Sequence, residues 1–324
     1  MKGKNRLWRK VIIGLISILI LIVGGIAWTI NSTLNKLDKE DIDESKLLIN
    51  QEELNKYENS EEIINIALFG LDSQDGSSGR TDSIMILTLD TVHKKVKVTS
   101  IMRDSYVDIE NYGMDKINHA YAYGKAELAI STINQNFGMD IQDYALVNFT
   151  SLPAIVNALG GIDLEIAEDE VQYMNEYIDS INYLEGTSSP HITTAGVHHL
   201  DGVQSLAYAR VRYTDGGDYM RTERHRIILN ALFEKIKKIP ATEYLSTLNT
   251  LLPYIKTSLS SSEILSLTTN ILNIISNPEL QMSRLPLDGH CEGIMLNGVY
   301  YLSFDREYTK QKFMDYIFND IDME

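Results

Sequence analysis

Five arginines gather in one short stretch of a chain that is otherwise strongly acidic. The stretch LDGVQSLAYARVRYTDGGDYMRTERHR begins at Leu200 and contains Arg210, Arg212, Arg221, Arg224 and Arg226. A guanidinium group donates hydrogen bonds in a planar fork that matches two phosphate oxygens at once, so the cluster is typical of a site for a multiply charged phosphate. The same residues also fit a helix face whose arginines pair with the neighbouring acids Asp215, Asp218 and Glu223.

A second group of charged residues follows an apolar run near the start of the domain. Residues 72–82 (DSQDGSSGRTD) contain Asp72, Asp75, Arg80 and Asp82. Arg103 follows a later apolar run in the same way. Loops at strand ends are where α/β folds hold chemically active groups. Asp72 and Asp82 could supply hard oxygen ligands to Mg²⁺ or Mn²⁺, while the arginines hold phosphate oxygens. Structural ion pairs among these side chains are the alternative interpretation.

The hydrophobic pattern predicts the elements that position these groups. Apolar or alternating runs predict strands, and apolar residues at helical spacing predict helices. The predicted strands are residues 63–71, 84–89, 96–101, 144–149 and 162–166, and the predicted helices are residues 118–137, 152–159, 202–209 and 222–238. In residues 239–324 the pattern predicts two or three further helices and a strand pair near Met282–Leu302. Strands that alternate with helices indicate a layered α/β domain.

The N-terminus has the pattern of an uncleaved membrane anchor. Residues 1–10 carry five bases and no acid, and residues 11–30 carry no charge. Twenty residues at about 1.5 Å each span the hydrocarbon core of a bilayer. The basic end predicts a cytoplasmic N-terminus, which places the rest of this single-pass protein outside the cell membrane. Residues 31–62, rich in charged and amide side chains, predict a stalk.

The charge balance limits the class of partner. Beyond the anchor, 24 Lys and Arg face 45 Asp and Glu, a net charge of −21. A domain that binds nucleic acid usually presents a broad basic surface, so no nucleic-acid partner is expected. Cys291 is the only cysteine, so no intramolecular disulfide can form and stability must come from an apolar core.

Four motifs in order resemble the LytR-CpsA-Psr family of cell-envelope enzymes. They are GLDSQDGSSGRTDSIM from Gly70, SIMRDSYV from Ser100, KINHAYAYG from Lys116 and the arginine-rich stretch from Leu200. The resemblance runs from about Ile63 to about Lys238. It implies an α-β-α sandwich around a mixed central sheet with an apolar, lipid-binding cavity, in which residues 63–238 form the catalytic domain and residues 239–324 complete it.

The resemblance also implies a function and a set of site residues. Members of this family are thought to move anionic glycopolymers, such as teichoic acid or capsular polysaccharide, from a polyprenyl-pyrophosphate carrier onto peptidoglycan, forming a phosphodiester. Asp72 and Asp82 match the metal-associated aspartates. The residues expected to bind phosphate are Arg80, Arg103, Arg210, Arg212, Arg221, Arg224 and His225. The residues expected to act in catalysis are Arg103, Arg210, Arg212, Asp218 and Arg221, with Asp218 as a candidate base.

Three positions depart from the family pattern, and two other functions stay open. Gln74 replaces a frequent arginine, Met102 a usual proline and His225 a frequent glutamine. His225 could become charged at mildly acidic pH, whereas glutamine cannot.

The same site could hydrolyse the pyrophosphate with water, or the protein could bind the lipid carrier as a non-catalytic regulator. The residues do not separate these alternatives.

Overall fold

The computed structural model describes residues 38–71, 79–148, 151–212, 217–240, 243–260, 263–264, 266–267 and 280–323. The predicted membrane helix, Asp72 and Gln74 lie outside these residues. Within the described ranges, no helix combines the length and the apolar character that a membrane span requires.

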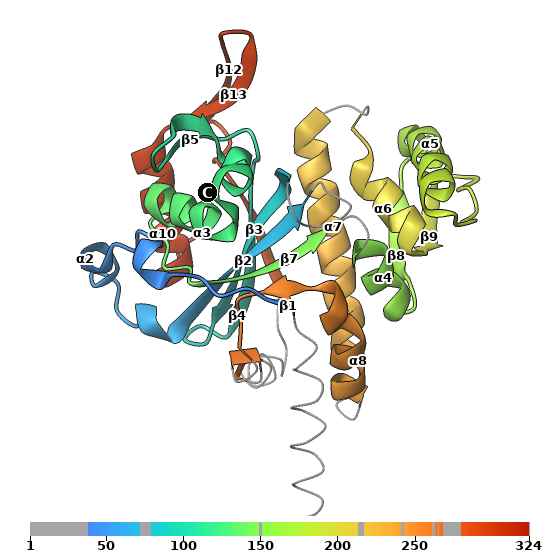
Figure 1. Ribbon diagram of the computed structural model, residues 1–324, viewed down its shortest axis with the longest axis horizontal. Coiled ribbons are helices and arrows are strands. Elements are labelled where there is room, and N and C mark those ends of the chain that lie inside the picture. The colour runs from blue at the N-terminus through green and yellow to red at the C-terminus, as the bar shows by residue number, and fades with distance from the viewer. Residues whose placement is uncertain are drawn as a thin grey trace, which may run out of the picture.

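A mixed sheet forms the centre of the molecule (Figure 1). In spatial order its strands are β1 (Asp38–Lys39), β10 (Lys256–Thr257), β7 (Asp143–Asn148), β2 (Ile63–Leu71), β3 (Thr81–Asp90), β4 (Lys95–Ile101) and β11 (Leu280–Leu285). β2 is parallel to β7 and antiparallel to β3, while β4 is antiparallel to β3 and parallel to β11. This confirms the α/β fold with a mixed central sheet.

Helices cover both faces of this sheet, as Figure 1 shows. On one side lie α3 (Ile117–Phe137), α10 (Arg306–Phe318) and the short α2 (Gln51–Leu54). On the other side lie α7 (Gly217–Lys237) and α8 (Tyr244–Leu251). Beyond α7 a lobe contains α4 (Ser151–Ala158), β8 (Ile162–Ile166), α5 (Glu168–Glu185), β9 (Gly196–Leu200) and α6 (Gly202–Arg210). The order helix, sheet, helix gives a three-layer arrangement with an added lobe.

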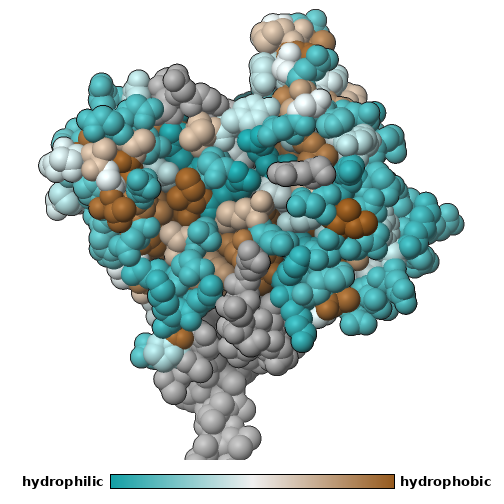
Figure 2. Space-filling view, turned by 180° about the vertical axis from the view of Figure 1, so that it is seen from behind, coloured by the Kyte–Doolittle hydropathy of each residue, from teal (hydrophilic) through white to brown (hydrophobic). Residues whose placement is uncertain are grey.

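Two small hairpins lie near the end of the sheet where β2 and β7 terminate. They are β5 (Tyr106–Ile109) with β6 (Gly113–Lys116), and β12 (Cys291–Leu296) with β13 (Val299–Phe304). Short 3-10 turns occur at Glu44–Lys46, Ser60–Glu62 and Leu252–Tyr254. From behind, the surface is mainly hydrophilic with small separate hydrophobic patches, and the β12–β13 hairpin stands out from it (Figure 2).

Strand alternation on β2 explains why the sheet can serve two cores. Phe69 and Leu71 belong to the large core against α3 and α10, whereas Ile66 and Leu68 belong to a cluster on the opposite face. Successive strand residues point to opposite faces, so a continuous apolar strand is expected between two helical layers. The lobe has a core of its own, formed by α4, α5, α6, α7 and the β8–β9 hairpin.

Several predicted boundaries need correction. The stalk predicted at residues 31–62 is not what its described part, residues 38–62, shows: Leu47 is fully buried and Leu54 is 3% exposed in the large core. Burial of these apolar residues stabilises a segment whose charged residues alone suggested an extended chain. α7 begins at Gly217, five residues before the expected Thr222, and α5 was not predicted at all. The expected C-terminal strand pair is the β12–β13 hairpin, and β11 joins the main sheet.

Candidate active site

The ends of three strands meet at one edge of the sheet. β2 and β4 both run antiparallel to β3, so the carboxyl ends of β2 and β4 lie beside the start of β3. Asp82 is the second residue of β3, and Arg103 comes two residues after β4 ends. Chain segments that are separate in sequence therefore come together here, as the sequence predicted.

Asp82 is the centre of the charged group at this edge. Its Oδ1 accepts a hydrogen bond from Nη1 of Arg103 at 2.8 Å, and its Oδ2 lies 3.0 Å from Nη2 of Arg221 and 3.2 Å from Nη2 of Arg212. Arg221 also donates to the backbone carbonyl of Asp82 at 2.9 Å. One carboxylate thus holds three guanidinium groups that come from the β4 end, the α6–α7 connection and α7.

The charge state of Asp82 follows from two opposing effects. Burial raises the pKa of its carboxyl group, but the guanidinium groups of Arg221, Arg103 and Arg212 outweigh burial and lower the pKa below its ordinary value. Asp82 is therefore ionised at neutral pH. Asp104 is a second carboxylate near Arg103, at 3.5 Å from its Nε. With Arg80 and Lys116 counted, five cations still outnumber these two carboxylates, which is the condition for binding a further anion.

These residues line a polar cleft. The polar cleft has a volume of about 450 Å³ and is lined by Arg80, Asp82, Arg103, Asp104, Lys116, Asn118 and Arg212. Lys116 donates to Asp104 at 2.5 Å, and the backbone N–H of Asn118 donates to the carbonyl of Arg103 at 3.3 Å. The sequence placed Lys116 and Asn118 in the KINHAYAYG motif but assigned them no role. Their position was a signal for a role in the site, because Lys116 precedes the predicted helix at residues 118–137 and Asn118 begins it.

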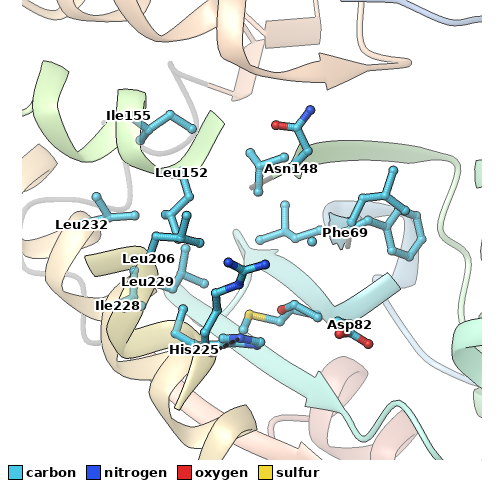
Figure 3. A pocket seen from close by; sticks show the side chains of 18 of the residues that line it. Phe69, Asp82, Asn148, Leu152, Ile155, Leu206, His225, Ile228, Leu229 and Leu232 are labelled. Carbon is cyan, nitrogen blue, oxygen red and sulfur yellow. Dashed lines mark hydrogen bonds between the residues drawn. The ribbon is translucent and has the colours of Figure 1, made fainter. Parts of the chain in front are cut away.

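An apolar cavity adjoins the polar cleft. The apolar cavity has a volume of about 300 Å³, and its walls come from β2, β3, β7, α4, α6 and α7. Figure 3 shows Leu206, Ile228, Leu229 and Leu232 gathered on the helical side, with Asp82 across the space from them. Asp82 and Arg212 line both spaces. The site therefore offers one apolar compartment and one cationic compartment that meet at two residues.

Other predicted site residues occupy different positions. Arg210, the last residue of α6, lines the apolar cavity. Arg224 lies away from both spaces: its Nε donates to Glu170 at 2.7 Å and its Nη1 donates to the carbonyl of Val211 at 3.0 Å, and its side chain is 1% exposed. We therefore correct its assignment, because a buried guanidinium with these partners stabilises the contact between α7 and the lobe. Asp218 lies at the start of α7, and its side chain, like Asp72, is outside the described part of the site.

His225 borders the apolar cavity, and its environment keeps it neutral. Its Nε2 lies 3.2 Å from the carbonyl oxygen of Ala209, so the neutral tautomer with a proton on Nε2 donates there. Burial, followed by the nearby Arg221, lowers the pKa of His225 to about 3. The sequence left open whether His225 becomes charged at mildly acidic pH. The lowered pKa keeps it neutral there, because an apolar wall and a neighbouring cation both disfavour the imidazolium.

The described carboxylates do not form a metal centre by themselves. Among the residues that the structure describes, no three His, Cys, Asp or Glu side chains gather around a common point. Mg²⁺ requires fewer protein ligands than that, since one or two carboxylates together with substrate phosphate and water suffice. Asp82 is ionised and stands at the edge of the polar cleft, but its two oxygens already lie within 3.2 Å of three guanidinium groups, so a cation bound there must displace at least one of them.

Comparison with known proteins decides the family. The profile of the LytR_cpsA_psr family matches residues 26–315. A curated relative in Bacillus cereus, polyisoprenyl-teichoic acid–peptidoglycan teichoic acid transferase TagU, is 32% identical over 307 residues, which cover 93% of this chain and 92% of that protein. The chain belongs to the LytR_cpsA_psr family.

Solved structures agree with this membership. TagT bound to LIIa-WTA superposes with a TM-score of 0.61 at 26% identity, over 79% of this chain and 91% of that chain. A TagT structure with bound octaprenyl pyrophosphate lipid has a TM-score of 0.59 at 24% identity, over 79% of this chain and 90% of that chain. At that identity the second comparison shows the fold shared by the LytR_cpsA_psr family.

Proposed function

We propose that this protein is a membrane-anchored phosphotransferase that moves an anionic glycopolymer from a polyprenyl-pyrophosphate carrier to peptidoglycan. The observation that carries the proposal is the junction at Asp82 and Arg212, where the apolar cavity meets the polar cleft. A polyprenyl pyrophosphate has the same division into an apolar tail and a charged head. The names of the curated relatives support the teichoic acid type of polymer.

The apolar cavity is suited to the first isoprene units of the carrier. Aliphatic residues of α4, α6 and α7 form much of its walls, and burial of apolar surface contributes about 25 cal/mol per Å². His225 and Arg210 stand on the same wall as the aliphatic residues. A neutral His225 adds no charge to the tail compartment, whereas Arg210, at the carboxyl end of α6, can contact a phosphate where the tail joins it.

The arginines around Asp82 prepare the polar cleft for the pyrophosphate. Asp82 holds the guanidinium groups of Arg103, Arg212 and Arg221 in place before any substrate arrives. Donors fixed in advance require little reorganisation when charge develops on the leaving phosphate. Arg80 and Lys116 add positive charge from the other walls of the polar cleft. A peptidoglycan hydroxyl then attacks the phosphorus that carries the glycan. The products are a phosphodiester between glycan and peptidoglycan, and polyprenyl phosphate as the leaving group.

A divalent cation, Mg²⁺ or Mn²⁺, belongs to this proposal. Asp82 would hold it together with Asp72, and the cation would neutralise pyrophosphate charge in the transition state. Asp218, at the start of α7, is the proposed base for the acceptor hydroxyl. The proposed anchor at residues 11–30 would place the site outside the membrane, where peptidoglycan is found.

Reconstitution tests the proposal and separates it from its alternatives. The full-length protein in lipid nanodiscs would receive a defined polyprenyl-pyrophosphate glycan, uncross-linked peptidoglycan strands and Mg²⁺. Mass spectrometry should find glycan joined to peptidoglycan through one phosphate. Release of glycan phosphate only, in equal amount with and without acceptor, would instead indicate a phosphohydrolase. An unchanged donor in the presence of saturating acceptor would indicate a binding protein.

A chelator arm addresses the metal separately. Excess EDTA should abolish transfer, and added Mg²⁺ should restore it. Full turnover in EDTA would contradict the metal role while leaving the phosphotransferase proposal intact.

A further inference from the structure

A group of tyrosines lies beside the polar cleft on the side away from the apolar cavity. Tyr112, in the turn between β5 and β6, stacks on Tyr123 with ring centroids 4.3 Å apart and an interplanar angle of 11°. Both rings are exposed, Tyr112 by 54% and Tyr123 by 42%. The inner ring faces cover one another, so the exposed aromatic surface of the two residues consists of outer faces and ring edges. We call Tyr112 and Tyr123 the tyrosine pair.

One carboxylate holds the tyrosine pair against the cleft. Asp115 Oδ2 accepts from the hydroxyl of Tyr123 at 2.7 Å and lies 2.9 Å from Nδ1 of His119, while its Oδ1 accepts from the backbone N–H of Lys116 at 2.8 Å. The ammonium group of Lys116 lines the polar cleft and lies 5.6 Å from the ring centroid of Tyr301. The tyrosine pair and the polar cleft are therefore joined through consecutive residues, Asp115 and Lys116.

The backbone fixes this arrangement. α3 is interrupted at Gly124 and Lys125, where φ of Lys125 is 58°, so Ile117–Tyr123 forms a short helical segment of its own. The backbone N–H of Ile117 donates to the carbonyl of Ser105 at 2.9 Å, and that of Asn118 donates to the carbonyl of Arg103. The segment that carries Tyr123 is thus attached directly to the loop that carries Arg103.

We propose that the tyrosine pair stacks on sugar rings of the acceptor glycan strand and guides its hydroxyl to the polar cleft. The proposal rests on the phosphotransferase function proposed above. The negative face of a tyrosine ring attracts the slightly positive C–H groups of a pyranose. Asp115 and His119 stand at the edge of the pair, where ring hydroxyls of a neutral sugar can reach polar atoms.

The direction of attack favours the acceptor over the donor as the occupant. In phosphoryl transfer the incoming and leaving oxygens lie roughly in line on opposite sides of the phosphorus. In the proposed reaction the leaving polyprenyl phosphate would point to the apolar cavity, whose walls include α4, α6 and α7. β5 and α3 lie across the central sheet from these helices (Figure 1). The incoming hydroxyl must therefore arrive from the side on which the tyrosine pair lies.

Kinetics of ring-removal variants test the proposal. In the reconstituted full-length protein, Tyr112→Ala should raise the KM for peptidoglycan strands about tenfold, because one exposed stacking surface is lost. The KM for the lipid-linked donor and kcat should change by less than about twofold. Tyr112→Phe keeps the ring and should behave as wild type. Tyr183→Ala is the matched control, since Tyr183 is 87% exposed and lies on α5, which lines neither the polar cleft nor the apolar cavity.

A binding arm separates this proposal from the function on which it rests. Saturation-transfer NMR with a β-1,4-linked N-acetylglucosamine tetrasaccharide should show contact in wild type and in Tyr112→Phe, and a weaker signal in Tyr112→Ala. If wild type binds this probe through Tyr112 but transfers no glycan, the phosphotransferase proposal fails and the stacking surface stands. An unchanged acceptor KM in Tyr112→Ala, or a rise in the donor KM instead, would overturn the acceptor proposal.

Discussion

The polar cleft and the apolar cavity share Asp82 and Arg212, yet different forces hold them together. In the polar cleft, the carboxylate of Asp82 holds three guanidinium groups, with contacts of 2.8 to 3.2 Å. In the apolar cavity, each aliphatic residue from α4, α6 and α7 contributes a small van der Waals attraction, and these attractions add up. We infer that the chemistry depends on a few residues, none of which can be replaced without loss of activity. Recognition of the lipid tail is instead shared by many residues, each of which can be replaced at a small cost.

The largest effect is expected at Asp82. Asp82→Ala leaves three guanidinium groups without their common anion, and Arg221 is only 3% exposed. Loss of one partner of a buried ion pair typically costs about 3–5 kcal/mol. We therefore expect transfer to be lost and the free energy of unfolding to fall by that amount, measured by urea denaturation.

An exposed pair provides the control for Asp82. Asp288 pairs with Arg284, and its side chain is 77% exposed. Asp288→Ala should change the free energy of unfolding by less than about 1 kcal/mol. Equal losses of unfolding free energy in the two variants would show that Asp82 stabilises the protein no more than a surface ion-pair partner does. They would also show that the cations of the polar cleft do not depend on Asp82.

Two arginines three residues apart on α7 sharpen the comparison. Arg221 faces Asp82, whereas Arg224 faces Glu170, and both are buried. Lysine keeps the charge but loses the fork geometry. Arg221→Lys should lower kcat by about 10² with a small change in melting temperature, comparable to the loss of one transition-state donor. Arg224→Lys should lower stability by about 1–3 kcal/mol while kcat stays within a factor of two or so. The reverse pattern would contradict our placement of both residues.

The sequence predicted which segments meet at the site better than it predicted where the helices and strands begin and end. Arg103 and Asp82 could be brought together in advance because each follows or begins an apolar strand, and strand ends meet at one edge of a sheet. Arg221 and Arg224 could not be told apart. Helical spacing of about 100° per residue turns Arg224 toward the lobe, but only the packing of α5 supplies Glu170 as its partner.

Residues 38–62 show the same limit in the fold. Their charge pattern indicated a stalk, and Leu47 and Leu54 were too few to suggest a core by themselves. They become buried because α3 and α10 provide apolar partners from distant parts of the chain, and the carbonyl of Leu47 accepts from Asn134 at 2.9 Å. Tertiary contacts of this kind leave no local signal in a single sequence.

The apolar cavity should respond more mildly than the polar cleft. Leu229 lines the cavity from α7. Leu229→Trp adds a large ring to this space and should raise the KM for a long polyprenyl donor about tenfold, the cost of roughly 1.4 kcal/mol of lost tail burial. A donor with a two-isoprene tail should be affected less, and hydrolysis or transfer of bound donor should keep its kcat. A fall in kcat for both donors would indicate that the cavity also positions the reacting phosphate.

The smallest expected effect concerns pH and His225. The folded pKa of His225 is lowered to about 3, against an ordinary value near 6.5. Above pH 6.5 both the folded and unfolded states are neutral at this position. Below pH 6.5 the unfolded chain binds a proton at this position and the folded state does not. The free energy of unfolding therefore falls, as the pH is lowered, by up to about 1.4 kcal/mol per pH unit.

Comparison with a glutamine variant isolates this contribution. His225→Gln does not titrate, so it should lose less stability than wild type between pH 6.5 and pH 4, as measured by urea denaturation at each pH. Burial raises the pKa of Asp140 to about 6, which has the opposite sign because the folded state then binds the extra proton. Asp140 is the same in both proteins and cancels in the difference. Parallel stability curves would mean that His225 is hydrated, and the wall of the apolar cavity next to Arg221 would then be open to water.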